Sequence, residues 1–322
     1  MKWRKHGKIF DPTQHCLPNG CYEFAQSPQA LVFDEFVRIY FSTRQKDPLN
    51  GKYLSHIAYI DMNMELNRIE HVSKNTVIDL GNLGCYDEHG IFPLNVLKRE
   101  STIFGYIGGW NRRVSVSVDT AIGLAISKDN GKYFKRIGNG PVLSSSPREP
   151  FLVGDPFVMN ICGKFYMWYI FGVEWKRFTE DQEPDRIYKI GYALSDDGIN
   201  WLKPEEGRPI ISDRLGKDES QAMPTVINFG GRYHMFFCYR ESFDFRKSPS
   251  RGYRIGYAYS YNLLEWIRDD RQVGIDVSEQ GWDSDMMCYP RVFENNGKIY
   301  MLYNGNHFGR FGFGLAVLES EF

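Results

Sequence analysis

The chain has 322 residues, a formal net charge of −1 and 42% hydrophobic residues, which is enough apolar material for a full core. Aromatic residues make up 16%, and aromatic side chains favour pleated sheets. The near-neutral charge gives no reason to expect a nucleic acid or an anionic membrane as partner. No stretch approaches 18 apolar residues, so no membrane span is predicted.

The six cysteines form no CxxC pair, which argues against a structural zinc site, and neither a metal nor another cofactor is predicted. The N-terminus, Met1 to His6, has no apolar run behind it, so no signal peptide is predicted. We therefore expect a soluble, cytoplasmic protein. The sequence does not indicate an oligomeric state.

A repeat of about 65 residues runs along the chain, and each unit opens on a proline. The prolines are Pro28, Pro93, Pro156, Pro224 and Pro290, spaced by 65, 63, 68 and 66 residues. A second strand is predicted after each proline, at 38–41, 102–105, 164–167, 232–235 and 298–301. A third strand carries an alanine, at Ala58, Ala125, Ala193, Ala258 and Ala316, and Asp-Gly or Asn-Gly turns follow two of these strands.

Five units of four strands are typical of a five-bladed β-propeller. The fourth, outer strand is predicted at positions such as 208–211. The last unit ends after its third strand, and residues 3–10 resemble an outer strand, so the N-terminus is expected to complete the last blade and close the ring. The sequence thus predicts one all-β domain over residues 1–322, with little helix and a polar rim loop at 176–186. A β-sandwich whose strand spacing recurs is the weaker alternative.

Acidic residues stand shortly before four of the five prolines. In a propeller the first strand of each blade lines the central channel, so these side chains are expected to converge near its axis. The candidate catalytic residues are Asp87, Asp155, Glu219 and Asp285. Acid and base catalysis on a glycosidic bond needs one protonated and one ionised carboxyl group. Each acid taken alone could instead be a turn or cap residue.

Other polar and aromatic residues follow the second strands and are predicted to bind a sugar. Aromatic faces stack on sugar rings, and Arg and Asn pair with carboxylates and hydroxyls. The candidate substrate-binding residues are Arg44, His89, Trp110, Trp175, Arg240, Asn304 and Asn306. For His89, a structural role is favoured over a sugar contact. Trp201 and Trp266 are better explained by packing between blades.

These features resemble the five-bladed propeller glycoside hydrolases of families 43, 32 and 130. The shared motifs are Asp155-Pro156, the strands at 164–167 and 298–301, and the turn from Ser195 to Trp201. Asp87-Glu88-His89-Gly90, Trp282 to Asp285 and Tyr303 to Asn306 look like a branch found in bacterial surface-polysaccharide gene clusters. That branch is similar to the N-terminal domain of plant glucosamine inositolphosphorylceramide transferases.

The resemblance to family 43 implies a role for two residues and leaves one position unfilled. Asp155 matches the aspartate that tunes the acid, and Glu219 is the nearest match to the acid itself. The base position of the first blade holds Ser27. Asp87 or Asp285 would have to replace the base, and Asp11 is a weaker substitute.

Three functional hypotheses follow from these residues. The first is a glycosidase-like enzyme that hydrolyses a glycan or glycoconjugate with paired carboxylates. The second is a non-catalytic glycan-binding propeller, favoured by Ser27 in place of the base. The third is phosphorolysis or glycosyl transfer, which would need a basic anion pocket, with Arg44, Arg240 and Arg291 as candidates.

Overall fold

The structure is a computed structural model that describes residues 1–320. It is all-β, with 52% strand and 5% helix, which confirms the predicted class and the scarcity of helix. Within the described residues, no helix is long and apolar enough to cross a membrane. The helices are five short 3-10 turns: η1 (Pro12–Gln14), η2 (Pro18–Gly20), η3 (Pro249–Arg251), η4 (Asp270–Gln272) and η5 (Asn306–Gly309).

The strands form antiparallel sheets in the order that the repeat predicts. The largest sheet contains β2 (Glu23–Val32), β3 (Val37–Lys46), β4 (Tyr53–Met62), β6 (Gly90–Arg99), β7 (Thr102–Arg112), β8 (Val118–Ser127) and β9 (Lys135–Arg136) in that order. In the same sheet, β5 (Ile69–Val72) pairs with β4. A single parallel bridge, from Ser55 to Gly90, joins its two halves.

The remaining strands form three further sheets. The first holds β10 (Val153–Ile161), β11 (Lys164–Lys176) and β12 (Asp185–Ser195). The second holds β13 (Glu219–Phe229), β14 (Arg232–Glu241), β15 (Arg254–Ser260) and β16 (Ile267–Arg268). The third holds β17 (Cys288–Asn295), β18 (Lys298–Asn304), β19 (Phe313–Ser320) and β1 (Lys2–Phe10).

The outer strands differ from the prediction in one sheet. The sheet of β10, β11 and β12 has three strands, and residues 208–211 are not a strand. Arg208-Pro209 has a proline that lacks the backbone N–H a ladder needs. Isolated backbone hydrogen bonds remain there, such as the one that Ile210 N–H donates to the carbonyl of Ile190 at 3.0 Å.

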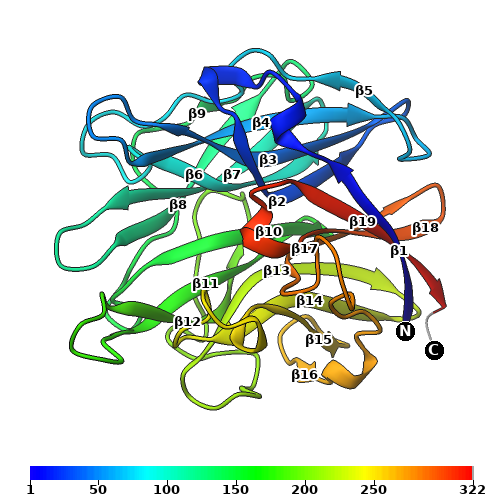
Figure 1. Ribbon diagram of the computed structural model, residues 1–322. Coiled ribbons are helices and arrows are strands. Elements are labelled where there is room, and N and C mark those ends of the chain that lie inside the picture. The colour runs from blue at the N-terminus through cyan, green and yellow to red at the C-terminus, as the bar shows by residue number, and fades with distance from the viewer. Residues whose placement is uncertain (321–322) are drawn as a thin grey trace.

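The chain ends meet in one sheet, as expected. Strand β1 pairs antiparallel with β19, with Arg4 opposite Val317. Lys5 Nζ forms an ion pair with Asp283 Oδ2 at 2.7 Å, and Trp3 donates from Nε1 to the carbonyl of Val273 at 3.0 Å. In Figure 1 the N-terminal strand lies beside the C-terminal one.

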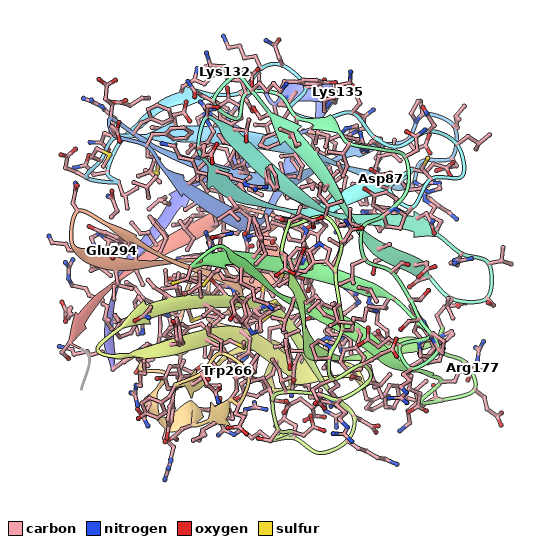
Figure 2. All side chains as sticks on the ribbon, turned by 180° about the vertical axis from the view of Figure 1, so that it is seen from behind. Asp87, Lys132, Lys135, Arg177, Trp266 and Glu294 are labelled. Carbon is pink, nitrogen blue, oxygen red and sulfur yellow. The ribbon has the colours of Figure 1, made fainter. Side chains whose placement is uncertain are left out.

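The first strands meet in the middle of the molecule, where Figure 1 places β2, β10, β13 and β17. Neighbouring contacts run from β2 to β6, β6 to β10, β10 to β13, β13 to β17, and β17 back to β2. Between the sheets, aromatic side chains make the core. Trp201 packs against Tyr106 at 5.9 Å between ring centroids, and Trp266 against Trp168 at 6.0 Å, as predicted for packing tryptophans. Figure 2 shows Arg177, on the 177–184 hairpin, at the periphery.

Candidate functional site

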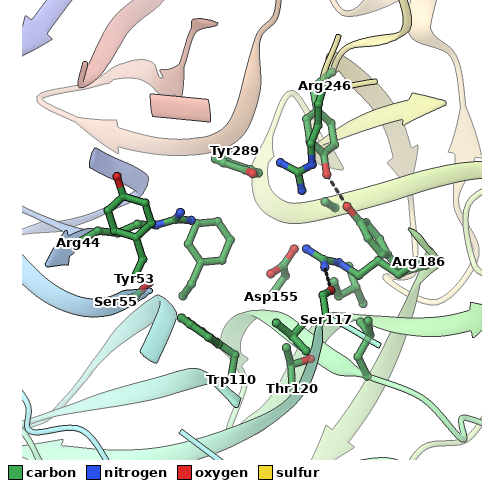
Figure 3. Close-up of a pocket in the computed structure, with 18 residues that line it drawn as sticks. Arg44, Tyr53, Ser55, Trp110, Ser117, Thr120, Asp155, Arg186, Arg246 and Tyr289 are labelled. Carbon is green, nitrogen blue, oxygen red and sulfur yellow. Dashed lines mark hydrogen bonds between the residues drawn. The ribbon is translucent and has the colours of Figure 1, made fainter. Parts of the chain in front are cut away.

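A cavity of about 340 Å³ opens where the first strands meet, and 18 residues line it (Figure 3). Its walls come from different sheets: Arg44 from β3, Trp110 from β7, Asp155 from β10 and Tyr289 from β17. Asp155 is the one acidic residue among those that line it. The cavity is therefore the natural place to look for the predicted chemistry.

Before four of the five strand-opening prolines, the preceding residue is held in an uncommon conformation. Ser27, Asp155, Met223 and Tyr289 have φ values of 54°, 49°, 51° and 56°, in the left-handed region that non-glycine residues seldom adopt. The ladder shifts register there, as between Gly154 and Phe157. Such a bulge re-aims a side chain, and strained backbone gathers at functional sites.

The re-aimed side chains contact one another near the middle of the molecule. Asp155 Oδ2 accepts a hydrogen bond from Met223 N–H at 3.3 Å, and Ser27 Oγ lies 3.6 Å from Met223 Sδ. Phe92, before Pro93, packs edge-on against Tyr289 at 5.2 Å between ring centroids. Residues far apart in sequence are thus brought together where the strands shift register near their prolines.

Asp155 carries the chemistry that an acid catalyst needs. Its side chain is buried, and desolvation raises its pKa to about 7, against the lowering effects of the Met223 N–H and of Arg186. A carboxyl group with that pKa is protonated in a large fraction of molecules at neutral pH. It can therefore give a proton to a leaving oxygen.

Three arginines line the same cavity, and none of them forms an ion pair among the described residues. Within residues 1–320, Arg44 and Arg246 form no ion pair and donate no side-chain hydrogen bond to protein, and Arg186 reaches only Ser117 Oγ at 3.3 Å. Figure 3 shows Asp155 between Arg44 on one side and Arg186 and Arg246 on the other. The cavity thus has an excess of positive charge.

The arginine charges are held in place by aromatic rings. The guanidinium of Arg44 lies 4.4 Å from the Phe24 ring centroid, and that of Arg246 lies 4.7 Å from Phe245 and 5.2 Å from Phe308. Desolvation lowers the pKa of Arg44. The pKa of Arg246 is lowered first by desolvation, although the residue as a whole is exposed, and then by repulsion from Arg186 and Arg240. An anion in the cavity would relieve these costs.

Arg240 lies behind one wall and does not line the cavity. It is fully buried, and its Nη2 donates to Tyr188 Oη at 3.1 Å, while its guanidinium stacks on Phe245 at 3.5 Å. Tyr188 and Tyr253 line the cavity and share a hydrogen bond between their hydroxyls. Arg240 therefore positions these two tyrosines.

Two of the predicted acids are enclosed in ion pairs away from the cavity. Glu219 is fully buried, and its Oε1 pairs with Arg268 Nη1 at 2.6 Å, while Oε2 accepts from the backbone N–H groups of Arg214 and Leu215, both at 2.9 Å. Asp87 is equally buried, and its Oδ2 accepts from Arg136 Nε at 2.8 Å. Figure 2 labels Asp87 at the edge of a sheet. These contacts are those of structural carboxylates.

Asp285 and the two asparagines belong to the turns of the last sheet. Asn306 Oδ1 accepts from the Asp285 N–H at 2.8 Å. Asn304 is fully buried; its Oδ1 accepts from Ser27 N–H and its Nδ2 donates to the carbonyls of Ala25 and Gly312, all at 2.8 Å. None of the three lines the main cavity. Asn304 instead fixes β2 against the last sheet.

The other candidates lie at or behind the rim. His89 stacks on Trp110 at 6.0 Å between centroids, and Trp175 lies 6.0 Å from the guanidinium of Arg186. Arg291 is half-buried and lies over the Phe157 ring at 4.7 Å, and desolvation lowers its pKa to about 10. Of the seven predicted sugar-binding residues, Arg44 and Trp110 line the cavity. No group of three or more potential metal ligands occurs in the described chain.

Sequence reasoning missed Arg186, Arg246 and the tyrosines of the cavity wall. Arg186 stands in β12, at the end of the predicted rim loop at 176–186, and Arg246 lies in the loop after β14. A signal was present for Arg186, because a loop between the second and third strands belongs to the face where the first strands begin. The tyrosines at 53, 188, 253 and 289 gave none, since aromatic residues occur throughout these strands.

Comparison with known proteins gives relatives along the whole chain. The "Uncharacterized protein Rv1502" of Mycobacterium tuberculosis is 35% identical over 327 residues, covering 99% of this chain and 100% of that protein. A 1,2-beta-oligomannan phosphorylase of Thermoanaerobacter is 29% identical over 118 residues, which are 36% of this chain and 35% of the phosphorylase. No protein-family model matches the chain.

Solved structures with the same fold include glycoside hydrolases. A structure of BT0996 in an RGII complex has a TM-score of 0.72 at 17% identity and covers 98% of this chain and 91% of its own. A thermostable family-43 glycoside hydrolase has a TM-score of 0.63 at 14%, with coverage of 93% and 92%. A structure from the GH130 family of mannoside phosphorylases, described as containing glycoside hydrolases that target beta-1,2 mannosidic linkages in Candida mannan, has a TM-score of 0.69 at 14% identity, with coverage of 98% and 92%. The chain therefore belongs to the family of the mycobacterial protein Rv1502, and it has the propeller-type fold of family 43 and family 130 glycoside hydrolases.

Proposed function

We propose that this protein cleaves a glycosidic bond of a glycan or glycoconjugate by phosphorolysis, with Asp155 as the acid. One observation carries the proposal: the cavity holds a single carboxyl group of raised pKa beside arginines that form no ion pair among the described residues. Hydrolysis by two carboxylates needs a second one within about 5–9.5 Å across the scissile bond. Glu219 and Asp87 are already paired with arginines, and Asp285 does not line the cavity.

The proposed reaction needs only the groups that the cavity provides. Arg186 and Arg246 hold inorganic phosphate, and a phosphate oxygen forms a bond to the anomeric carbon as the glycosidic C–O bond breaks. The Asp155 carboxyl proton passes to the leaving oxygen, and the carboxylate regains a proton from solvent. The products are a sugar 1-phosphate and a shortened glycan. Phosphate is already an anion, so no second carboxylate is required as base.

Two further observations support this proposal. The partial similarity to an oligomannan phosphorylase, over 118 residues, agrees with phosphorolysis. The cyclic contacts of β2, β6, β10, β13 and β17, with β1 paired to β19, support a single five-bladed propeller whose ring closes in the last blade. A central cavity shared by all blades follows from that architecture.

The test begins with phosphate itself. Binding of inorganic phosphate is measured by calorimetry for the wild type, for Arg186→Ala and Arg246→Ala, and for Arg208→Ala, an exposed arginine paired with Glu205, as control. We expect the two cavity variants to lose at least tenfold in affinity and the control to lose none. A wild type that does not bind phosphate would contradict the proposal.

Turnover is then assayed in the synthetic direction, as phosphate release from a panel of sugar 1-phosphates with sugar acceptors. Asp155→Asn should abolish release while phosphate binding persists. A second candidate function, glycan binding without catalysis, is favoured by Ser27 at the expected base position, where it contacts Met223. Sugar binding by the wild type with no turnover of the panel, in either phosphate or water, would favour that candidate.

A further inference from the structure

Arg44 stands apart from the other two cavity arginines. It lies in β3, across Asp155 from Arg186 and Arg246 in Figure 3. Its Nε is buried and has no hydrogen-bond partner among the described residues, and the Phe24 and Tyr53 rings lie 4.4 and 5.6 Å from its guanidinium. A buried donor without a partner is costly, so its retention points to a ligand that supplies the acceptor.

A charge count shows that phosphate alone does not balance the cavity. Three arginines contribute three positive charges, and Asp155 is neutral when it acts as an acid. A bound phosphate group brings about −1.5 to −2 at neutral pH. About one positive charge is left over. Figure 3 shows Arg44 on the other side of Asp155 from Arg186 and Arg246, the two arginines assigned to phosphate. The charge that Arg44 would pair with is therefore a single negative one on the sugar.

The surroundings of Arg44 suit a sugar ring. Arg44 faces Ser55 across β3 and β4, and Ser55 is bridged to Gly90, against which Trp110 packs. Arg44, Tyr53, Ser55 and Trp110 all line the cavity and form what we call the Arg44 corner. It combines an aromatic face for a sugar ring, two hydroxyls and a planar guanidinium. A guanidinium fork matches a carboxylate in two parallel hydrogen bonds.

We propose that the Arg44 corner binds the carboxylate of an acidic sugar, so that the glycan acted on contains a uronic-acid unit next to the bond that is cleaved. The proposal rests on the proposed function for the position of that bond. The binding of the carboxylate can be tested without it.

The experiment compares methyl glycosides of glucuronate, galacturonate and mannuronate with the corresponding neutral methyl hexosides. Affinities are measured by ligand-detected NMR titration for the wild type, Arg44→Ala, Arg44→Lys and the control Arg208→Ala. We expect at least one uronate to bind tenfold more tightly than its neutral partner. Arg44→Ala should remove that preference, so that each uronate binds no more tightly than its neutral partner in that variant. Arg44→Lys should retain part of it, since the charge stays and the fork is lost.

Three results would overturn the proposal. One is equal binding of each uronate and its neutral partner, or no binding of any uronate. Another is a preference that survives in Arg44→Ala. The last is a preference lost in Arg246→Ala instead, which would place the carboxylate in the pocket assigned to phosphate. Failure of the proposed function is separate, since it would appear as absent phosphate binding while the uronate preference and its dependence on Arg44 remained.

Discussion

The raised pKa of Asp155 makes a quantitative prediction for stability. In the folded protein desolvation raises the pKa to about 7, from the 3.8 of an exposed aspartate. The folded state therefore favours the protonated form, and the stability that this gives is fully present below pH 4. It is lost as the pH rises through 7. A difference of about three pKa units corresponds to about 4 kcal/mol.

Asp155→Asn isolates this effect because the amide has the same shape and does not ionise. Denaturant unfolding is measured in phosphate-free buffer between pH 4 and pH 8 for the wild type, for Asp155→Asn, and for Asp34→Asn as a control outside the cavity. We expect the wild type to lose stability relative to Asp155→Asn by about 1.4 kcal/mol per pH unit up to the folded pKa. The control should follow the wild type.

The opposite slope would refute the reasoning. If the wild type gained stability over Asp155→Asn as the pH rose, the carboxylate would be ionised and stabilised by Arg186, and its role as a proton donor would be untenable. Agreement would also fix the pH dependence of catalysis. Turnover should fall as the pH rises through 7, because the ionised carboxylate has no proton to give.

Three more predictions concern residues around the site. Glu219→Gln should lower the free energy of unfolding by about 3 kcal/mol, because Arg268 would lose its buried partner. Turnover per folded molecule should persist. A stable but inactive variant would restore Glu219 as the acid. Trp3→Ala should lower the free energy of unfolding, measured in denaturant, by about 3–5 kcal/mol, since Trp3 is buried against Phe236. An unchanged denaturation midpoint would show that β1 adds little to stability. Tyr253→Phe keeps the ring but removes the hydroxyl bonded to Tyr188. Neutral-sugar affinity should fall several-fold, with thermal stability nearly unchanged. Equal sugar affinity of the variant and the wild type would exclude this hydroxyl from sugar binding.

The repeat in the sequence was informative about the fold because strand order depends on local patterns. The second and third strands lie where their aromatic and alanine residues predicted them. The first strands begin earlier than their prolines, as β13 begins at Glu219 and Pro224 follows within it. Each proline marks a bulge inside a strand. Residue types such as Ser27, Met223 and Tyr289 give no hint of a left-handed conformation, so the bulges were not foreseen.

The same bulges explain which acid reaches the cavity. Asp155 directly precedes its proline and is therefore the residue that the bulge turns inward, whereas Glu219, Asp285 and Asp87 stand five or six positions earlier. Grouping the acids by their nearness to a proline ignored the direction of each side chain. The arginine pocket was hidden for another reason. Arg44 and Arg246 are 202 residues apart, and only packing of different sheets brings them to one cavity.

The cavity is linked by contacts to the sheet in which β1 pairs with β19. Asn304 in β18 holds Ser27 and Ala25 of β2, and β18 is in the sheet that β1 completes beside β19. Tyr289, from the same sheet, packs on Phe92 and lines the cavity beside Asp155. Loosening β1 would therefore let water reach Asp155, and added hydration would lower its pKa toward that of an exposed carboxyl. If Asp155 is the acid, as proposed, its protonated form would then depend on an intact last sheet, and turnover would be lost together with that sheet.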